Sequence, residues 1–440
     1  MVARRGHQVV VFETDADPAA VTADDDFNSP RPGVPQGQHG HVFRARVSRV
    51  LREEVPDVID EMLIHGIPKA GFDFGDGYEN DFALMARRPV LEAVLRRVVG
   101  HEAGVEVRTG ERVTGLTAAG DGSVPRVSGV RTRGGHTAPA DLVIDCCGRR
   151  SASPRWLAEL GAGLGLEHYQ PCDLHYFARH YRLLPGTHFP NTTFPDGAFT
   201  PYGIFLAMAE DNGTFCLAGA LSKADPYRSS FRNEKLFDRV MAALPRMQTW
   251  AGAGTPITDV ELMGGLANRR RSLLKNGQPT VTGLLLLGDA SHYTNATFGQ
   301  GVALGFWQAQ ALARHAHLIG QDHPALLCEV EAWTNRVLGP RYAQQVQVDE
   351  AMVGGLRAGV AGGPLVRTRD PGGALAAMAA LGDTQAGIAF YRIDNLLTDL
   401  TAEVSDTSLN RRLETFLADI KEGPDGLGPL PRAAFEAILR

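Results

Sequence analysis

The sequence lacks the features that mark several classes of protein. No apolar run approaches the ~20 residues that a membrane-spanning helix needs, and no secretory signal peptide is recognisable, so we expect neither a membrane span nor export. Its five cysteines show no spacing typical of a disulfide framework or a metal motif, which suits a reducing cytoplasm. The formal net charge of −6 and the scattered basic residues argue against a nucleic-acid partner.

A second absence concerns nucleotide binding. Residues Gln8–Phe12 are predicted to form a buried strand that ends in Glu13, as the second strand of a Rossmann unit does. The glycine-rich turn G-x-G-x-x-G, which holds a pyrophosphate and precedes such an acid by about 20 residues, is not in the sequence. Either roughly 20–25 further residues upstream carry the first strand and this turn, or the chain does not bind a dinucleotide in the ordinary manner. We favour the first, because loss of the central first strand predicts a damaging gap in the sheet.

The most informative stretch is Leu284–Gly305, LLLLGDASHYTNATFGQGVALG. Its four leucines predict a buried strand, Gly288-Asp289 ends that strand, and Gly299-Gln300-Gly301 opens a helix. Such a strand, acid and glycine-flanked helix start predict a ligand crevice in an open α/β sheet. The Asp289 carboxylate can accept hydrogen bonds from sugar-like hydroxyls, while free N–H groups at the helix start can face an anionic or electron-rich ring. The alternative is an ordinary strand–loop–helix connection.

Two further segments offer candidate residues. The loop 31–41, RPGVPQGQHGH, is made rigid by proline and glycine and presents Gln36, His39 and His41. We expect no metal at the two histidines, because no other ligand lies at a suitable spacing; the alternative is a surface loop with solvated histidines. The segment 141–151, DLVIDCCGRRS, predicts an apolar strand with Asp145 and Gly148 at its end, or a purely structural strand end, with Cys146–Cys147 as a buried pair of small residues.

Hydrophobic periodicity predicts the remaining elements. The sequence predicts a turn at 75–77, a basic solvated turn at Arg269–Arg271, and aromatic residues (including Phe194) that form a core or line an apolar pocket. Predicted strands are 104–108, 112–116, 127–133, 175–183, 203–209 and 214–221; predicted helices are 42–64 with a break at Pro56, a helix opening at Arg88-Pro89, 231–248, the helix after Gly301, 325–357, 375–400, 408–421 and 431–439.

Four landmarks in order carry a resemblance to a known family: the strand ending in Glu13, the RPGVPQG loop, DCCGRRS, and GDA followed by GQG. Over about residues 4–400 the chain resembles class A, para-hydroxybenzoate hydroxylase-type FAD-dependent monooxygenases, in particular the polyketide-tailoring epoxidases and hydroxylases. The resemblance implies an α/β fold with a Rossmann-like FAD-binding domain whose first βα unit is missing, a mixed-sheet substrate domain and a helical C-terminal region. The implied boundaries are 1–164 and 266–320 for the FAD-binding domain, 165–265 for the substrate domain and 321–440 for the helical region.

The resemblance also implies where FAD would bind. In the family the aspartate matched by Asp289 binds the ribityl chain, and the backbone matched by Gly299–Gly301 sits against the isoalloxazine. Arg88 matches a family arginine near the flavin, although a solvated helix-start arginine is an equal alternative. The implied cofactor-binding residues are Glu13, Gln36, His39, Arg88, Asp145, Gly148, Gly288, Asp289, Phe298, Gly299, Gln300 and Gly301.

The implied activity is transfer of one oxygen atom to an aromatic ring or alkene of a small hydrophobic, polyketide-like substrate, with NAD(P)H as electron donor to FAD. The protein would supply a dry pocket and correct placement, so no catalytic acid or base is predicted. Two departures concern the flavin: the missing glycine-rich turn, and Ala296 in place of a proline that fixes the backbone. They support a second hypothesis, a redox-neutral [4+2] cyclase that acts by proximity, with the flavin structural or lost. A non-catalytic binding protein is a third.

Overall fold

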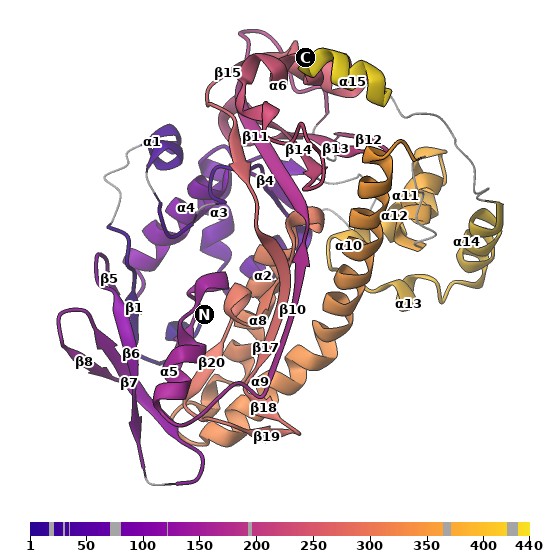
Figure 1. The fold of residues 1–440 in the computed structure, drawn as a ribbon. Coiled ribbons are helices and arrows are strands. Elements are labelled where there is room, and N and C mark those ends of the chain that lie inside the picture. The colour runs from indigo at the N-terminus through magenta and orange to yellow at the C-terminus, as the bar shows by residue number, and fades with distance from the viewer. Residues whose placement is uncertain are drawn as a thin grey trace.

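The computed structural model describes residues 1–16, 22–29, 31–34, 36–70, 81–120, 122–191, 196–363, 371–419 and 430–440. These residues form an α/β part, a large antiparallel sheet and a helical end (Figure 1). Among them, no helix combines the length and the apolar character that crossing a membrane requires. The turn predicted at 75–77 and Phe194 lie outside the described residues.

The α/β part begins the chain and packs its helices around one apolar core. Helices α2, α3, α4 and α8 meet through buried residues that include Val47, Met62, Val94 and Leu304. The predicted helix 42–64 breaks at Pro56 as expected, because a proline fits the first turn of a helix but not its interior. The elements are η1 (Ala3–Arg5), β1 (Val9–Phe12), α1 (Ala23–Asn28), β2 (Val42–Phe43), α2 (Ala45–Glu54), α3 (Pro56–Ile64), β3 (Lys69–Ala70), β4 (Ala83–Met85), α4 (Arg88–Gly100), β5 (Val105–Arg108), β6 (Val113–Ala119), β7 (Arg126–Thr132), β8 (Thr137–Pro139), β9 (Val143–Asp145), η2 (Gly148–Arg150) and α5 (Ser153–Glu159).

The parallel strands of this part form two separate pairs. Strand β1 pairs with β5, and β9 pairs with β20 (Leu284–Leu286), both in parallel. In the described residues no pairing joins β1 to β9. The amide of Val9 donates to Gly104 and that of Val143 donates to Gly283, so the alternate residues Val10 and Ile144 turn their backbone groups away from these partners. Within the described residues, β1 and β9 therefore each have one edge without a paired strand.

The open edges also decide the exposure of nearby apolar side chains. Val10, Val11 and Ile144 are 42%, 39% and 37% exposed, although β-branched residues in parallel strands are normally covered. Cys146 and Cys147, which follow β9, are exposed as well. The prediction that these two cysteines are a buried pair is wrong, because no described strand lies against this edge of β9.

The large sheet has the strand order β12-β13-β14-β11-β15, with β16 also pairing to β11, and all of these pairs are antiparallel. One face packs on helices through aromatic residues: Phe177 stacks on Phe231 with ring centroids 4.1 Å apart. The predicted helix 231–248 is split because Pro245 begins a new helix. The elements are β11 (Leu174–Leu183), β12 (Asp196–Thr200), β13 (Gly203–Ala209), η3 (Asp211–Gly213), β14 (Thr214–Ser222), η4 (Ser230–Arg232), α6 (Glu234–Ala243), α7 (Pro245–Ala251), β15 (Gly254–Pro256) and β16 (Glu261–Met263).

A three-stranded sheet connects the two parts. It consists of β10 (Leu166–Cys172), β17 (Leu266–Ser272) and β21 (His292–Tyr293). Arg269–Arg271 lie in β17 and not in a solvated turn, so that prediction is wrong. Arg271 is 6% exposed and its Nε lies 3.0 Å from Glu167 on β10. The carboxylate compensates the charge, which allows a basic triplet to occupy a central strand.

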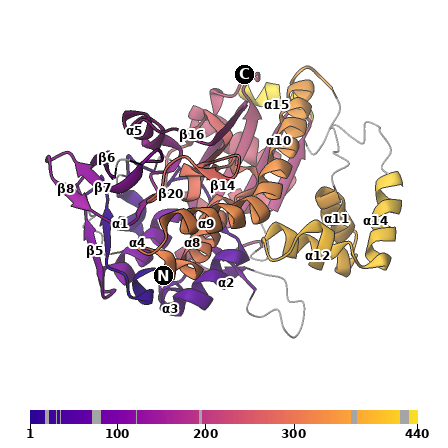
Figure 2. The ribbon, with the colours of Figure 1, turned by 90° about the horizontal axis from the view of Figure 1, so that it is seen from below.

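The helical end starts after β20 and runs along the outside of the molecule. Helix α10 contacts β10, β17 and β14, and so covers the connecting sheet. Helices α11, α12 and α14 form a separate cluster at one side (Figure 2), packed around Leu375, Ala386 and Leu409. The remaining elements of the chain, including two short strands before β20, are β18 (Leu274–Lys275), β19 (Gln278–Pro279), η5 (Gly288–Ala290), η6 (Ala296–Phe298), α8 (Gly301–Arg314), η7 (Ala316–Leu318), α9 (His323–Val337), α10 (Gly339–Val360), α11 (Pro371–Ala380), α12 (Thr384–Asp394), α13 (Leu400–Glu403), α14 (Thr407–Asp419) and α15 (Arg432–Leu439).

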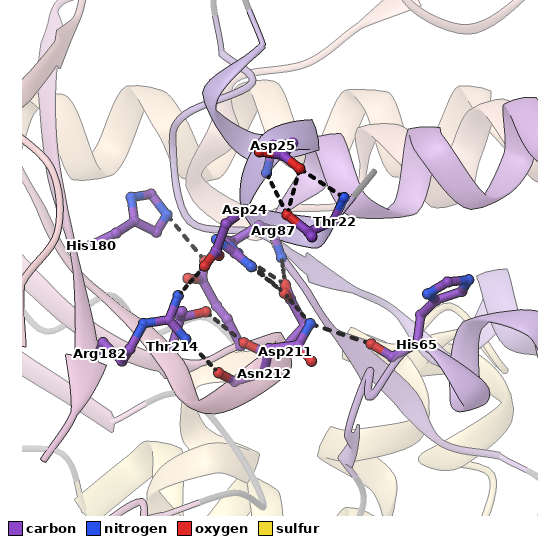
Figure 3. Close-up of polar contacts among 11 residues, drawn as sticks. Thr22, Asp24, Asp25, His65, Arg87, His180, Arg182, Asp211, Asn212 and Thr214 are labelled. Atoms are coloured by element: carbon purple, nitrogen blue, oxygen red, sulfur yellow. Dashed lines mark hydrogen bonds and ion pairs between the residues drawn. The ribbon is translucent and has the colours of Figure 1, made fainter. Parts of the chain in front are cut away.

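A buried ion pair joins the α/β part to the large sheet. Arg87, which precedes α4, is 1% exposed and lies 2.6 Å from Asp211 in the turn between β13 and β14 (Figure 3). Its other terminal nitrogen lies 2.8 Å from Asp24 of α1, and Asp24 also pairs with Arg182 of β11. Burial by itself would lower the pKa of Arg87, but the hydrogen bonds and charges of Asp211, Asp24 and Glu210 together outweigh burial, and the net shift is upward. The guanidinium therefore stays charged inside the protein.

We predict that Arg87→Ala lowers the free energy of unfolding by about 3–5 kcal/mol, because it leaves the buried Asp211 carboxylate without its partner. Urea unfolding followed by circular dichroism measures this change. The matched control is Arg108→Ala, whose guanidinium pairs with Glu106 on the surface and should leave stability unchanged. Equal stability of the two variants would contradict the structural role of the buried pair.

Candidate functional site

The connection from β20 to α8 reverses direction through two special glycines. Gly288 and Gly299 both have φ of +59°, in the left-handed region that favours glycine. Between them the chain forms η5, the short strand β21 and η6 before entering α8. The predicted strand–loop–helix is therefore present, and its loop brings Asp289 to the start of the helix. A Cβ on Gly301 would lie 3.7 Å from Asp289 Oδ1.

The start of α8 presents unbonded amides. Gln300 is its N-cap and accepts the first intrahelical bond, from Leu304, but no side chain caps the helix among the described residues. The first N–H groups of a helix have no partner within it, and the helix dipole places partial positive charge there. Helix α8 continues for 14 residues. Its N-terminus can therefore bind an anionic or electron-rich group.

The Asp289 carboxylate is free to accept hydrogen bonds. It is half-buried and makes no side-chain hydrogen bond to the part of the chain that the structure describes. Burial raises the pKa of Asp289, and the charges of Arg88 and Arg149 oppose that shift. An acceptor that is partly withdrawn from water and unpaired costs stability unless a ligand satisfies it. Of the predicted residues, Asp289 is the one that the structure leaves most clearly available.

Gly148 lies beside Asp289, whereas Asp145 accepts hydrogen bonds from its own turn. A Cβ on Gly148 would be 3.9 Å from the Asp289 Cβ, and its φ of +69° again favours glycine. Asp145 is 5% exposed and accepts from Cys147 N at 2.8 Å, from Ser153 Oγ at 2.5 Å and from Ser151 Oγ. Its oxygens are thus already engaged in shaping the turn that carries Gly148.

Two carboxylates, one buried and one partly buried, hold the loop before α8. Asp349 of α10 is 1% exposed and accepts from Asn295 and Thr297, each at 3.1 Å. At the other end of the loop, Arg44 donates to the Phe298 carbonyl at 3.0 Å and pairs with Asp394. These contacts fix the backbone around Ala296, the position at which the resemblance implies a rigid proline. Neither carboxylate could be found from sequence, because both lie on helices far along the chain.

Tyr176 of β11 connects the large sheet to the same loop. Its hydroxyl donates to Asn295 Oδ1 at 3.1 Å and lies 3.1 Å from Thr297 Oγ1. Burial raises the pKa of Tyr176, so the phenol remains neutral and able to donate. Tyr176 also packs with Tyr293 and Met263 in a small apolar cluster next to the loop. Strand β11 of the large sheet therefore lies close to the loop before α8.

Glu13 lies across the open edge from this site. One of its oxygens accepts from Asp15 N at 2.9 Å, and the other lies 3.4 Å from Arg31. Its charge helps to raise the pKa of Cys147, after the larger effects of burial, Asp145 and Cys146. Glu13 is therefore partly engaged by Arg31 and stands apart from Asp289.

The loop residues Gln36 and His39 make no recorded contact with Asp289 in the part of the chain that the structure describes. His39 is buried, and burial followed by the charge of His180 lowers its pKa to about 4, which places it toward the large sheet. Gln36 is half-buried in the turn before it. The pKa of His41 falls to about 3 through burial and then the charge of Arg88. The charge of Arg88 therefore acts on both Asp289 and His41, although His41 was not among the predicted cofactor residues.

Comparisons with known proteins agree with this architecture. A family model for tryptophan halogenase matches residues 78–155. Protein Rv3254 of Mycobacterium tuberculosis is 27% identical over 334 residues, which cover 70% of this chain and 67% of that protein. PqsL from Pseudomonas aeruginosa, a probable FAD-dependent monooxygenase, has a TM-score of 0.58 and 17% identity and covers 82% of this chain and 94% of its own.

Two further solved structures have different reactions in their names. The myxobacterial chondrochloren halogenase CndH has a TM-score of 0.58 and 18% identity, covering 97% of this chain and 94% of its own. The Diels-Alderase PyrE3 of the pyrroindomycin pathway has a TM-score of 0.55 and 16% identity, covering 88% and 80%. The chain thus has the α/β fold of FAD-dependent monooxygenases and halogenases, which confirms the predicted fold class.

The fold implies FAD, and the described residues match its two halves differently. The unpaired Asp289 and the free amides of α8 suit the ribityl chain and the isoalloxazine. At the other half, the described residues place no strand or helix N-terminus between β1 and β9, and Glu13 is partly engaged by Arg31. The described residues therefore offer contacts for the flavin half of FAD.

We predict that Asp145→Ala destabilises the chain by at least about 2 kcal/mol, because two buried hydroxyls and one amide lose a charged acceptor. Thermal or urea unfolding without added flavin measures this loss. Asp141→Ala, four residues earlier and exposed, is the control and should behave as wild type. If Asp145→Ala unfolded like the control, the carboxylate would not be what holds this turn.

Proposed function

We propose that this chain is a flavin-dependent monooxygenase that hydroxylates or epoxidises a small hydrophobic, polyketide-like substrate. The observation that carries the proposal is the half-buried, unpaired Asp289 carboxylate beside the free amides at the start of α8. The likeness of the fold to PqsL, whose structure has been solved with 2-aminobenzoylacetate, supports a small-molecule substrate.

In this proposal the residues of the chain have defined tasks. Asp289 accepts hydrogen bonds from the ribityl hydroxyls, and the amides of residues 301–303 stabilise negative charge on the ring system. The charges of Arg88 and Arg149 favour the ionised form of Asp289 and oppose the rise in its pKa that burial causes. When bound, FAD reduced by NAD(P)H supplies the oxygen-activating chemistry. Tyr176 and its apolar neighbours keep water from the substrate side.

A second candidate is a redox-neutral cyclase that folds a linear substrate in the same pocket. Ala296, which stands where the resemblance implies a rigid proline beside the flavin, favours it. The likeness to the Diels-Alderase PyrE3 supports this candidate too. Rate enhancement would then come from holding the reacting carbons close together in a dry pocket.

We predict that Asp289→Ala weakens FAD binding by roughly 10–100-fold, the loss expected when a charged hydrogen-bond acceptor is removed. Titration of flavin fluorescence with purified protein gives the dissociation constant. Asp141→Ala, which alters an exposed carboxylate outside the site, should bind FAD as wild type does. Unchanged affinity in Asp289→Ala would refute the assignment of this residue.

The reaction itself is tested with the purified full chain, added FAD and either NADH or NADPH. We expect oxygen uptake that a hydroxynaphthalene accelerates, with an oxygenated product identified by mass spectrometry. Conversion of a linear polyene carrying a diene and a dienophile, without oxygen uptake, would instead establish the cyclase. Incorporation of chloride or bromide into the hydroxynaphthalene would contradict the proposed monooxygenase activity and establish a halogenase activity instead.

A further inference from the structure

A second, fully buried cluster of polar side chains lies away from Asp289. His180 on β11 and Cys216 on β14 are register partners in neighbouring antiparallel strands, and Glu210 follows β13 in the adjoining hairpin. The three residues are 1%, 0% and 0% exposed. Each directs one ligand-type atom inward, and these atoms all lie within 4.8 Å of one another.

The polar atoms of this cluster are not satisfied by the protein. Both ring nitrogens of His180 and both carboxylate oxygens of Glu210 lack a hydrogen-bond partner among the described residues. His180 Nε2 lies 3.2 Å from Glu210 Oε1, close enough for an ion pair but not aligned for a hydrogen bond. Burying such groups without partners costs several kcal/mol. Native proteins rarely leave four such atoms together unless a ligand satisfies them.

The surroundings close the cluster tightly. A Cβ on Gly40 would lie 2.8 Å from Cys216 Sγ and 2.4 Å from Met208 Cε, so the backbone of the 36–41 loop packs directly on the thiol. The ring of Phe27 from α1 meets His180 edge-on at 4.8 Å. Figure 3 shows His180 next to the Arg87, Asp24 and Asp211 contacts that join the two parts of the molecule. The cluster is thus part of that junction.

We propose that His180, Glu210 and Cys216 form a binding site for one divalent transition-metal ion, with zinc the metal that suits the ligand set best. Imidazole nitrogen, carboxylate oxygen and thiolate sulfur are the three ligand types of protein zinc sites, and the separation of their atoms is within reach of a single ion. The thiolate excludes magnesium and calcium, which take oxygen ligands. One carboxylate and one thiolate balance the charge of the ion, which makes the loaded site neutral in its apolar surroundings.

A metal here has a structural consequence that does not depend on the proposed oxygenation. It links β11, the β13–β14 hairpin and, through the packing of Gly40 on Cys216, the 36–41 loop. Without an ion, burial lowers the pKa of His180, but the attraction of Glu210 and Cys216 together outweighs burial, so that the pKa rises and an imidazolium–carboxylate pair forms. This ion pair is the competing explanation of the cluster.

The experiment uses the full chain expressed in zinc-supplemented medium and dialysed against metal-free buffer. Elemental mass spectrometry should find close to one zinc ion per wild-type chain, since a buried site of this kind releases its metal slowly. Cys216→Ser and Glu210→Gln should each lose most of the bound zinc. Cys172→Ser, which alters a buried thiol outside the cluster, is the matched control and should keep it.

Cobalt substitution tests the ligands directly and does not require a stable variant. Wild type and Cys172→Ser loaded with Co²⁺ should show the absorption of thiolate-to-cobalt charge transfer, and Cys216→Ser should not. Wild-type protein that carries no zinc after supplementation and gives no cobalt–thiolate absorption would overturn the proposal. The cluster would then be an imidazolium–carboxylate ion pair without a metal.

Discussion

The packing of the α/β part on the large sheet depends on the buried ion pair between Arg87 and Asp211. A charged pair withdrawn from water is costly to break, since either partner alone would be left unsolvated. The pair fixes the start of α4 against the β13–β14 turn, and Asp24 extends it to α1. Arg88 is the next residue, and its charge reaches both Asp289 and His41. The contact that joins the two parts therefore also sets the electrostatic surroundings of the candidate flavin site.

Backbone hydrogen bonding explains the second distinctive feature, the open edge between β1 and β9. Strand backbones that lack a neighbour keep unpaired N–H and C=O groups, and apolar side chains such as Val10 and Ile144 remain exposed beside them. Glu13, at the end of β1, pairs with Arg31.

Local patterns in the sequence located several elements well and others poorly. The strand–loop–helix around Asp289 was predictable, because glycines at positive φ and a run of leucines act over a few residues. Arg269–Arg271 were mistaken for a solvated turn, since the carboxylate of Glu167 that permits them in a strand lies about a hundred residues earlier. Cys146 and Cys147 were expected to be buried because adjacent cysteines are more often a buried pair of small residues, but both are exposed at the end of β9.

The sequence by itself determined the fold class and the candidate seat for a flavin, because hydrophobic periodicity, proline positions and glycine-flanked turns are local properties. Tertiary structure alone decided which polar groups are satisfied. It engaged the oxygens of Asp145, left Asp289 free, and brought His180, Glu210 and Cys216 within reach of one ion. Such groupings arise from strand register and packing between distant segments, and no spacing along the chain encodes them.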